Sequence, residues 1–424
     1  MGRDLVKRYS IEKIGVRNLI ALLADVYRSG KVRESVSFAV WELCYRTGIF
    51  SKRNRLKFNS GPILRLQGPE IGSAEFENRI AEHFHHRALR IVRSPHSWKR
   101  FFVDSRGNLY GYIEHDNNSL YKCCPGAESL ERIGRFVEKI KSIFVSSSGT
   151  VFVSVRGALY RGFDNGGEFQ KVLALSSSDS FIRHNYAMTE TPDGTLIIGE
   201  YGNVWEHNRW RNLAYLYFSS DNGISWRKTD FLIRRGVNKH VHMIHYSRRL
   251  DRLLLADGDN RKQLWVSDPA GCYSIDDIRW RLRTSWHIQT GGYTSIVECD
   301  GKILFGTDYQ GGTNFLVETN DAKRLVKKVV PDPYRRSPIH SLLRRQSRRG
   351  CEIWANLPVS TGRSKSLLMY TEDNGGSWNR VIEYDSRTHG VSLIGAASMA
   401  VTEVYCAIND MKNERRVVYR ITDC

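Results

Sequence analysis

The chain has 424 residues, of which 41% are hydrophobic and 26% charged, so its composition is that of a folded globular protein and excludes a disordered chain. Its formal net charge of +19 favours polyanionic partners such as acidic glycans, anionic lipid headgroups or nucleic acid. A basic soluble protein without such a partner is the alternative.

The first ten residues, MGRDLVKRYS, lack the apolar run of a signal peptide. No apolar run in the sequence approaches the roughly 18 residues of a membrane span. The eight cysteines include no C-x-x-C pair and no pair at zinc-finger spacing from a histidine. We therefore expect a cytoplasmic protein with reduced cysteines and without a cofactor or a structural metal.

Residues 1–95 form the first predicted unit, a basic helical extension. Apolar residues recur at helical spacing from Ile14 to Val26 and again from Val36 to Cys44, on either side of Gly30. This pattern predicts two amphipathic helices with Lys and Arg on their outer faces. Such helices pack on a neighbouring domain or lie on a membrane surface, so peripheral membrane contact is one predicted role.

Residues 96–424 form the second predicted unit, in which seven similar stretches of short strands and tight turns follow one another. Their spacing of roughly 40 to 50 residues is typical of propeller blades. The sequence therefore predicts an all-β, seven-bladed β-propeller with an N-terminal α-helical extension, and six blades are the alternative. The last stretch lacks a clear fourth strand, so we expect Pro62–Gln67 or Leu89–Ser94 to close the ring.

One turn sequence occurs three times. The copies are SSDNGISWRKT from Ser219, TEDNGGSWNRV from Thr371 and, as a partial match, GFDNGGEFQKV from Gly162. A hydroxyl and a carboxylate at these positions cap free backbone N–H groups, and glycine supplies a positive φ. The aromatic ring covers the turn, so we expect Trp226 and Trp378 to be buried.

This motif, Ser/Thr-x-Asp-x-Gly-x-x-Trp/Phe, resembles the Asp-box (BNR) repeat of sialidase-like propellers. That superfamily includes sialidases, other glycoside hydrolases, polysaccharide lyases and non-catalytic binding propellers. The Arg-Ile-Pro motif of true sialidases does not occur in this sequence. The resemblance therefore implies a propeller that acts on or binds carbohydrate, and the histidine content is more similar to propeller lyases and unusual hydrolases.

Blade geometry places the segments that lead into each innermost strand, and the loops between second and third strands, on one face. These segments are rich in His, Tyr, Arg and carboxylates, with His340 and His389 at equivalent places in later blades. Such groups divide acid and base roles, and Arg holds a carboxylate. The predicted catalytic residues are His184, His242, Tyr293 and Asp257. The predicted substrate-binding residues are Arg183, Glu200, Tyr201, His240, Asp259, Arg261, Asp308 and Tyr309.

His240 and His242 would point to one side of a strand, so a metal site completed by Asp257 or Asp259 is an alternative to a metal-free site. We expect a carbohydrate-active propeller acting on an acidic glycan, as a glycoside hydrolase or a uronate lyase. The alternative is a non-catalytic scaffold that binds a polyanionic glycan or a protein partner. Nucleic acid is not expected, since no common aromatic-basic binding motif occurs.

Overall fold

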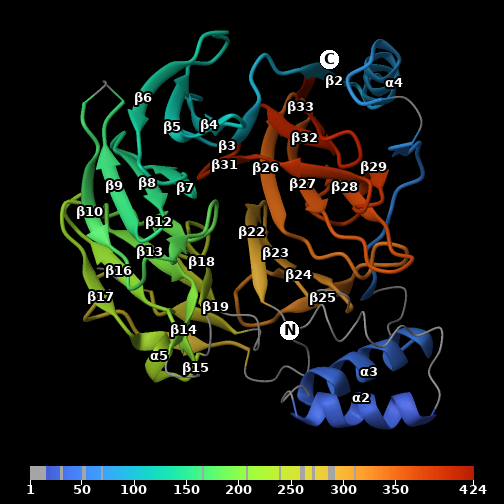
Figure 1. Ribbon diagram of the computed structural model, residues 1–424, viewed down its shortest axis with the longest axis horizontal. Helices are drawn as coiled ribbons and strands as arrows, with labels where there is room; N and C mark the ends of the chain where they lie inside the picture. The colour runs from blue at the N-terminus through green and yellow to red at the C-terminus, as the bar shows by residue number, and fades with distance from the viewer. Residues whose placement is uncertain are drawn as a thin grey trace.

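The computed structural model describes residues 16–28, 32–49, 54–67, 70–164, 167–206, 209–237, 240–257, 263–269, 273–284, 292–309 and 312–424. Within these residues, seven sheets of four or five strands are arranged around one axis, as Figure 1 shows. The fold is therefore the predicted seven-bladed β-propeller, and the six-bladed alternative is wrong.

Each blade runs from an innermost strand at the axis to an outermost strand at the rim. Blade 1 consists of β3 (Trp98–Val103), β4 (Leu109–Ile113), β5 (Asp116–Cys123) and β6 (Glu131–Arg135). Blade 2 consists of β7 (Ser142–Val145), β8 (Val151–Val155), β9 (Ala158–Gly162) and β10 (Gln170–Ala174). Blade 3 consists of β12 (Met188–Glu190), β13 (Leu196–Tyr201), β16 (Leu216–Ser219) and β17 (Arg227–Thr229). The short strand β11 (Phe181–Ile182) also pairs with β13. Between β13 and β16 the chain forms a two-stranded ribbon of β14 (Asn203–Glu206) and β15 (Arg209–Asn212).

The remaining blades follow the same plan. Blade 4 consists of β18 (Val241–Ser247), β19 (Arg252–Asp257), β20 (Leu264–Ser267) and β21 (Trp280–Leu282). Blade 5 consists of β22 (Tyr293–Cys299), β23 (Lys302–Thr307), β24 (Phe315–Thr319) and β25 (Val326–Val329). Blade 6 consists of β26 (Ser341–Ser347), β27 (Gly350–Leu357), β28 (Ser366–Thr371) and β29 (Asn379–Tyr384). Blade 7 consists of β30 (His389–Leu393), β32 (Val404–Asp410), β33 (Arg415–Asp423) and β2 (Leu89–Arg93).

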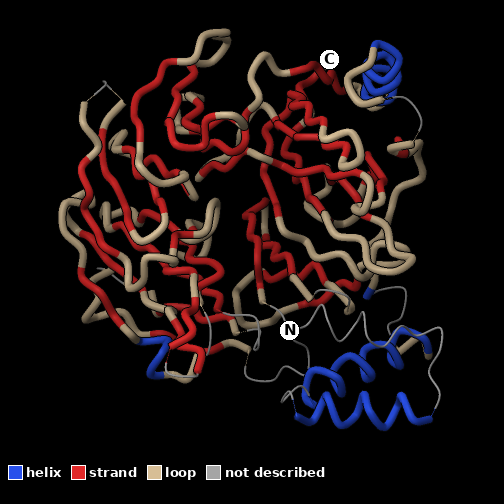
Figure 2. The backbone as a smooth tube through the Cα atoms, in the orientation of Figure 1, coloured by secondary structure: helices blue, strands red, loops and turns tan. Residues whose placement is uncertain are grey.

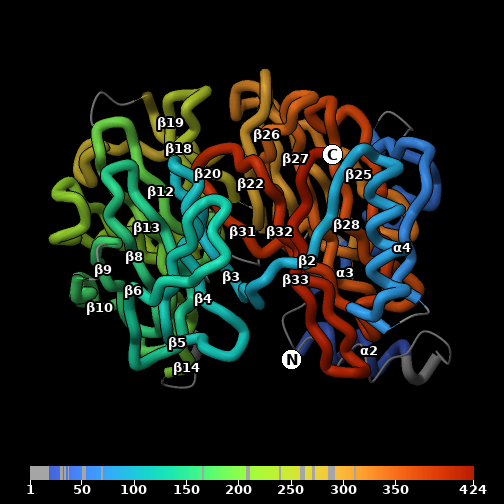
Figure 3. Tube along the Cα trace, turned by 90° about the horizontal axis from the view of Figure 1, so that it is seen from above, coloured from blue at the N-terminus to red at the C-terminus, as the bar shows by residue number. Residues whose placement is uncertain are grey.

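The ring is closed by strands from both ends of the chain. Strand β2 pairs antiparallel with β33 and is the outermost strand of blade 7, and Figure 3 shows the two side by side. On the inner side, β31 (Gly395–Ala397) leaves blade 7 and pairs parallel with β3 of blade 1. The short strand β1 (Leu64–Arg65) extends the outer edge of blade 6 by pairing with β29. Both segments named from the sequence therefore add to the sheets, and Leu89–Arg93 closes the ring.

The helices lie at the rim, as the blue segments of Figure 2 show. They are α2 (Val16–Arg28), α3 (Val32–Arg46), α4 (Ala74–His85) and the short α5 (Phe231–Arg234). The Ser73 side chain caps α4 by accepting the N–H of Phe76, and Phe76 packs into the core between blades 6 and 7. The two helices expected near the N-terminus are α2 and α3. In the part of the chain described here, no helix is long and apolar enough to cross a membrane.

The repeated turn has the expected hydrogen bonds. The Ser219 Oγ accepts the N–H of Gly223 at 2.8 Å and donates to the Asp221 carboxylate at 2.7 Å. The second copy repeats the bond, since the Thr371 Oγ1 accepts the N–H of Gly375 at 3.1 Å. Both glycines have a positive φ, of 79° and 84°, which explains why glycine stands there.

The two tryptophans of these turns differ in burial. Trp378 is fully buried, as expected, in the core between blades 5 and 6. Trp226 is only half-buried, which corrects the expectation from the sequence. Its ring meets Phe152 of blade 2 edge-on at 6.3 Å, and its Nε1 donates to the Gly223 carbonyl at 3.2 Å, so its other side stays open to solvent.

We expect Trp378→Ala to lower the free energy of unfolding by about 3 kcal/mol or more, because it leaves a large cavity in a closed core. Chemical unfolding of both proteins measures the difference. Trp205→Ala is the matched control, since this tryptophan is exposed on the inserted ribbon. Equal losses in the two variants would show that Trp378 does not stabilise the blade.

Candidate functional site

The segment that leads into blade 3 crosses the axis of the propeller. The Tyr186 hydroxyl accepts the N–H of Leu342 and donates to its carbonyl, both at 3.0 Å, on blade 6. The Tyr186 carbonyl accepts the N–H of Ile244, on blade 4, at 2.6 Å. Asn185, with a φ of 77°, donates at 3.4 Å to the carbonyl of Gly395, on the strand β31 that is paired with blade 1. This crossing segment ties four blades together at the axis.

Two imidazoles lie in contact beside the crossing segment. His240 precedes β18 and His242 lies within it, and their Nε2 atoms are 3.1 Å apart. The spacing of two residues places both rings on one side of the strand, as the sequence predicts. A hydrogen bond between two Nε2 atoms needs one N–H and one lone pair, so one ring donates through its Nε2 and the other accepts. The residues are 4% and 1% exposed.

The rings of this pair are held by their neighbours. The Tyr201 ring centroid is 3.8 Å from that of His240 and 6.0 Å from that of His242. The Arg183 Nη1 donates to the His242 carbonyl at 3.4 Å. A Cβ at Gly292 would lie 2.4 Å from the His242 Nδ1, so glycine is required for this approach. Residues of blades 3, 4 and 5 thus meet in one place.

Asp308 and His340 complete this group. The Asp308 Oδ1 accepts the N–H of Gly292 at 2.5 Å. Burial, together with the charge of Arg183, lowers the pKa of His340 to about 4, whereas Asp308 acts in the opposite direction. His340 is therefore neutral at physiological pH. We call this group the axial cluster, and it consists of Arg183, Tyr201, His240, His242, Asp308 and His340.

Two of the predicted carboxylates are occupied by structural hydrogen bonds. Glu200 is fully buried and accepts the Ser180 hydroxyl at 2.5 Å and the Tyr217 hydroxyl at 2.7 Å. The Asp257 Oδ2 accepts the Trp265 Nε1 at 2.7 Å and is also buried. These bonds tie both carboxylates to groups of their own blades.

The other predicted site residues also lie elsewhere. Tyr293 packs in the apolar core of blades 4 and 5, with its ring against Phe305. Tyr309 is buried, and its backbone is held by the Asn314 side chain. His184 is buried, and burial with the charge of Arg100 holds its pKa well below the ordinary value.

Asp259 and Arg261 lie outside the described residues. Of the residues that are described, no group of three or more His, Cys, Asp or Glu side chains could hold a metal ion. The His240–His242 pair has Arg183 and Tyr201 around it, and the Asp257 carboxylate that would complete a metal site is bonded to Trp265.

Three cavities adjoin the site or the seam of the ring, and no sequence pattern predicts them. Two lie on the axis, have volumes of about 90 and 300 Å³, and share His245 and Arg248 in their walls. Arg183 lines the smaller one, so an axial cavity reaches the cluster. The His245 ring is 3.3 Å from the Glu298 carboxylate in the same wall.

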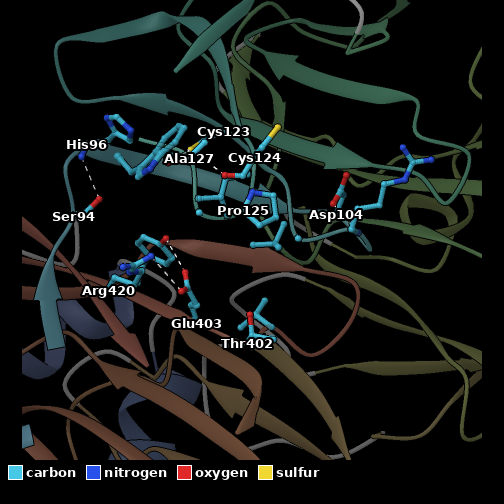
Figure 4. Close-up of a pocket in the computed structure, with 18 of the residues that line it drawn as sticks. Ser94, His96, Asp104, Cys123, Cys124, Pro125, Ala127, Thr402, Glu403 and Arg420 are labelled. Atoms are coloured by element: carbon cyan, nitrogen blue, oxygen red, sulfur yellow. Dashed lines mark hydrogen bonds and ion pairs between the residues drawn. The ribbon is translucent and has the colours of Figure 1, made fainter. Parts of the chain in front are cut away.

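The third cavity, of about 460 Å³, lies between blades 7 and 1 (Figure 4). In its wall the Arg420 guanidinium is 3.3 Å from the Glu403 carboxylate. The Cys123 thiol donates to the Ala127 carbonyl at 3.3 Å. Only ring closure brings residues 94–128 and 399–420 together, so no local sequence pattern could reveal this cavity.

Comparison with known proteins shows the fold. No family model and no curated protein matches the sequence. A catalytically inactive variant of virginiamycin B lyase from Staphylococcus aureus, solved with quinupristin, is similar with a TM-score of 0.53 and 14% identity over 79% of this chain and 98% of that chain. A streptogramin B lyase is similar with a TM-score of 0.51 and 13% identity over 79% and 97%. A chain of the mitotic checkpoint complex gives a TM-score of 0.48 and 9% identity over 85% and 98%.

We expect His340 to make the protein less stable in acid. The unfolded chain binds a proton near the ordinary pKa of 6.5 and the folded chain only near 4, so stability is lost as pH falls through this range. His340→Gln should therefore reduce the loss of unfolding free energy between about pH 7.5 and about pH 5. His115→Gln, on an exposed turn, is the control. An unchanged pH dependence in His340→Gln would contradict the assignment.

Proposed function

We propose that this protein is a carbohydrate-active propeller that takes an acidic glycan at the axial cluster. The observation that carries the proposal is the contact between the two Nε2 atoms of His240 and His242, 3.1 Å apart, beside the guanidinium of Arg183. An imidazole in such a pair can take or give a proton during a reaction, and a guanidinium binds and neutralises a carboxylate.

Among reactions on acidic glycans, β-elimination fits these groups best. The neutral imidazole of the pair takes the proton α to the uronate carboxylate, and Arg183 neutralises the charge that develops there. The electron pair of that C–H bond forms the new C=C bond while the β C–O bond breaks. The Tyr201 hydroxyl gives its proton to the leaving oxygen. Transfer of the proton from the imidazole pair to the phenolate restores the site.

Hydrolysis by two carboxylates has less support. Retaining and inverting glycosidases commonly use a pair of free carboxylates across the scissile bond. Glu200 and Asp257 are instead engaged with Ser180, Tyr217 and Trp265. Among the described cluster residues, Asp308 alone carries a carboxylate, and it accepts the N–H of Gly292.

The repeated turns support the placement among Asp-box propellers. Ser219 and Thr371 accept the N–H groups of Gly223 and Gly375, as the Asp-box interpretation expects. This favours a place among the sialidase-like propellers, whose members include glycoside hydrolases and polysaccharide lyases. Two propellers of similar fold are lyases, although their identity of 13 and 14% bears on the fold alone.

A non-catalytic glycan-binding role is the second candidate. The burial of His240 and His242, at 4% and 1%, favours it, because substrate must reach a catalytic imidazole. Arg183, Tyr201, Asp308 and His340 are half-buried and would form the rim of a binding site.

We expect the protein to cleave polyuronate oligosaccharides. The new C=C bond of the product absorbs ultraviolet light, so the rise in absorbance measures turnover. Tyr201→Phe keeps the ring against His240 and removes only the acid, and His242→Gln removes the base. Each should lower turnover by about 10²-fold or more with little change in melting temperature. His389→Gln, a half-buried histidine on blade 7, is the control and should keep full activity.

The two candidates separate in this assay. Loss of glycan affinity in Arg183→Gln without any product from wild type would favour the binding role. If wild type neither cleaves nor binds polyuronates, the proposal fails.

Because the net charge is +19, we expect affinity for a polyuronate to fall steeply with salt. Titration followed by calorimetry at about 50 mM and about 300 mM NaCl, across which the screening length roughly halves, measures this. An affinity that ignores ionic strength would show that the charge does not serve acidic ligands.

A further inference from the structure

Exposed apolar side chains are concentrated at the N-terminal end of the described chain. Ten of its 17 exposed large hydrophobic residues fall between Leu19 and Ile49, on or next to the hairpin of α2 and α3. A soluble propeller rim has no need of so many exposed apolar groups, and a concentration of this kind marks a contact surface.

The apolar residues form a stripe along each helix of this N-terminal hairpin. On α2, Ile20, Leu23 and Tyr27 recur at spacings of three and four residues and are 63%, 59% and 78% exposed. On α3 the exposed apolar residues at helical spacing are Val32, Val36, Val40 and Leu43. Residues at these spacings share one side of a helix.

The hairpin uses a different side of α3 to bind the propeller. The Trp41 ring meets Phe315 of blade 5 at 5.0 Å. The Glu42 carboxylate accepts two bonds from Arg335, at 2.5 and 3.2 Å. At about 100° per residue, Trp41 lies about 180° from Val32 and about 140° from Val36 around α3, so these two exposed valines face away from the side that carries Trp41. Figure 1 shows α3 between the propeller and α2, so α2 is the outermost element.

Positive charge accompanies these stripes. From Met1 to Lys57 the sequence has 13 Lys and Arg and only 5 Asp and Glu. Among these, Arg28 and Arg46 end the two helices and are exposed. Basic residues beside an apolar helix face match a bilayer surface of anionic lipid, which offers negative headgroups above an apolar interior.

We propose that the N-terminal hairpin docks this protein on an anionic membrane surface, with the apolar stripe of α2 inserted at the boundary between headgroups and acyl chains. At 13 residues α2 is about 20 Å long, shorter than the roughly 30 Å of a bilayer core, so it lies in the plane of the interface. The contacts of Trp41 and Glu42 then hold the propeller at that surface.

The test uses the full chain and co-sedimentation with vesicles of phosphatidylcholine alone or with phosphatidylglycerol added. We expect binding to the anionic vesicles, weak binding to phosphatidylcholine alone, and release at high salt. The double variant Ile20→Glu/Leu23→Glu should lower the affinity by roughly tenfold or more, because it places charge in the inserted stripe. Both side chains are exposed, so the melting temperature should not change.

The control separates insertion from simple attraction between charges. Ile224→Glu/Met411→Glu introduces the same two charges at exposed positions on propeller turns and should bind vesicles as wild type does. Equal affinities of the two double variants would overturn the proposal. So would a wild-type dimer in light scattering that Ile20→Glu/Leu23→Glu turns into a monomer, since the stripe would then be covered by a second copy.

Discussion

The antiparallel pairing of β2 with β33 turns seven sheets into a closed ring, and the rest of the structure depends on that closure. Residues from Leu89 to Arg93 face those from Tyr419 to Asp423 in five pairs. Without this strand β33 would expose an unpaired edge, and blade 7 would lack its outer strand. The inner seam is joined separately, because β31 leaves blade 7 to pair with β3. Closure also fixes the axis, since the crossing segment around Tyr186 is bonded to blades 4 and 6 and to β31 at the inner seam.

A buried charge joins the last strand, β33, to the neighbouring blade 6. Arg345 is fully buried on β26, and its guanidinium donates to Glu352 at 2.9 Å and to Asp423, near the end of the chain, at 2.6 Å. Its Nε donates to the Thr402 carbonyl at 3.0 Å. A buried guanidinium is tolerated only when its donors find such partners, and losing one of them leaves a costly unpaired charge. The last strand is therefore fixed by backbone pairing and by this side chain together.

Local patterns in the sequence predict local structure, and here they were sufficient for the fold. The bonds of the turn at Ser219 join residues within four positions, so hydroxyl, carboxylate and glycine identify a blade without knowledge of its neighbours. The period of two likewise predicted that His240 and His242 lie together. Contacts between loops could not be predicted in this way. Glu200 is engaged by Ser180 from another segment, and Tyr293 is buried by its neighbours in the core of two blades. The sequence therefore predicts which polar residues lie near the axis. The packing between segments determines which of their side chains are available to bind or react with a ligand.

The hairpin and the axial cluster meet in one continuous set of hydrogen bonds. Arg335 binds Glu42 of α3 through its side chain, and its backbone carbonyl accepts the N–H of Asn314 at 3.0 Å. The Asn314 side chain holds the backbone of Tyr309 at both ends, with bonds of 2.7 and 2.8 Å. Asp308 of the axial cluster precedes Tyr309, so the loop that places this carboxylate is held by the residue that anchors the hairpin. Coupling between two sites needs an element with two arrangements, whereas these bonds describe a single one. These bonds therefore hold the loop of Asp308 in one position. A protein that is bound to a surface through its N-terminal hairpin would keep the same arrangement of the axial cluster.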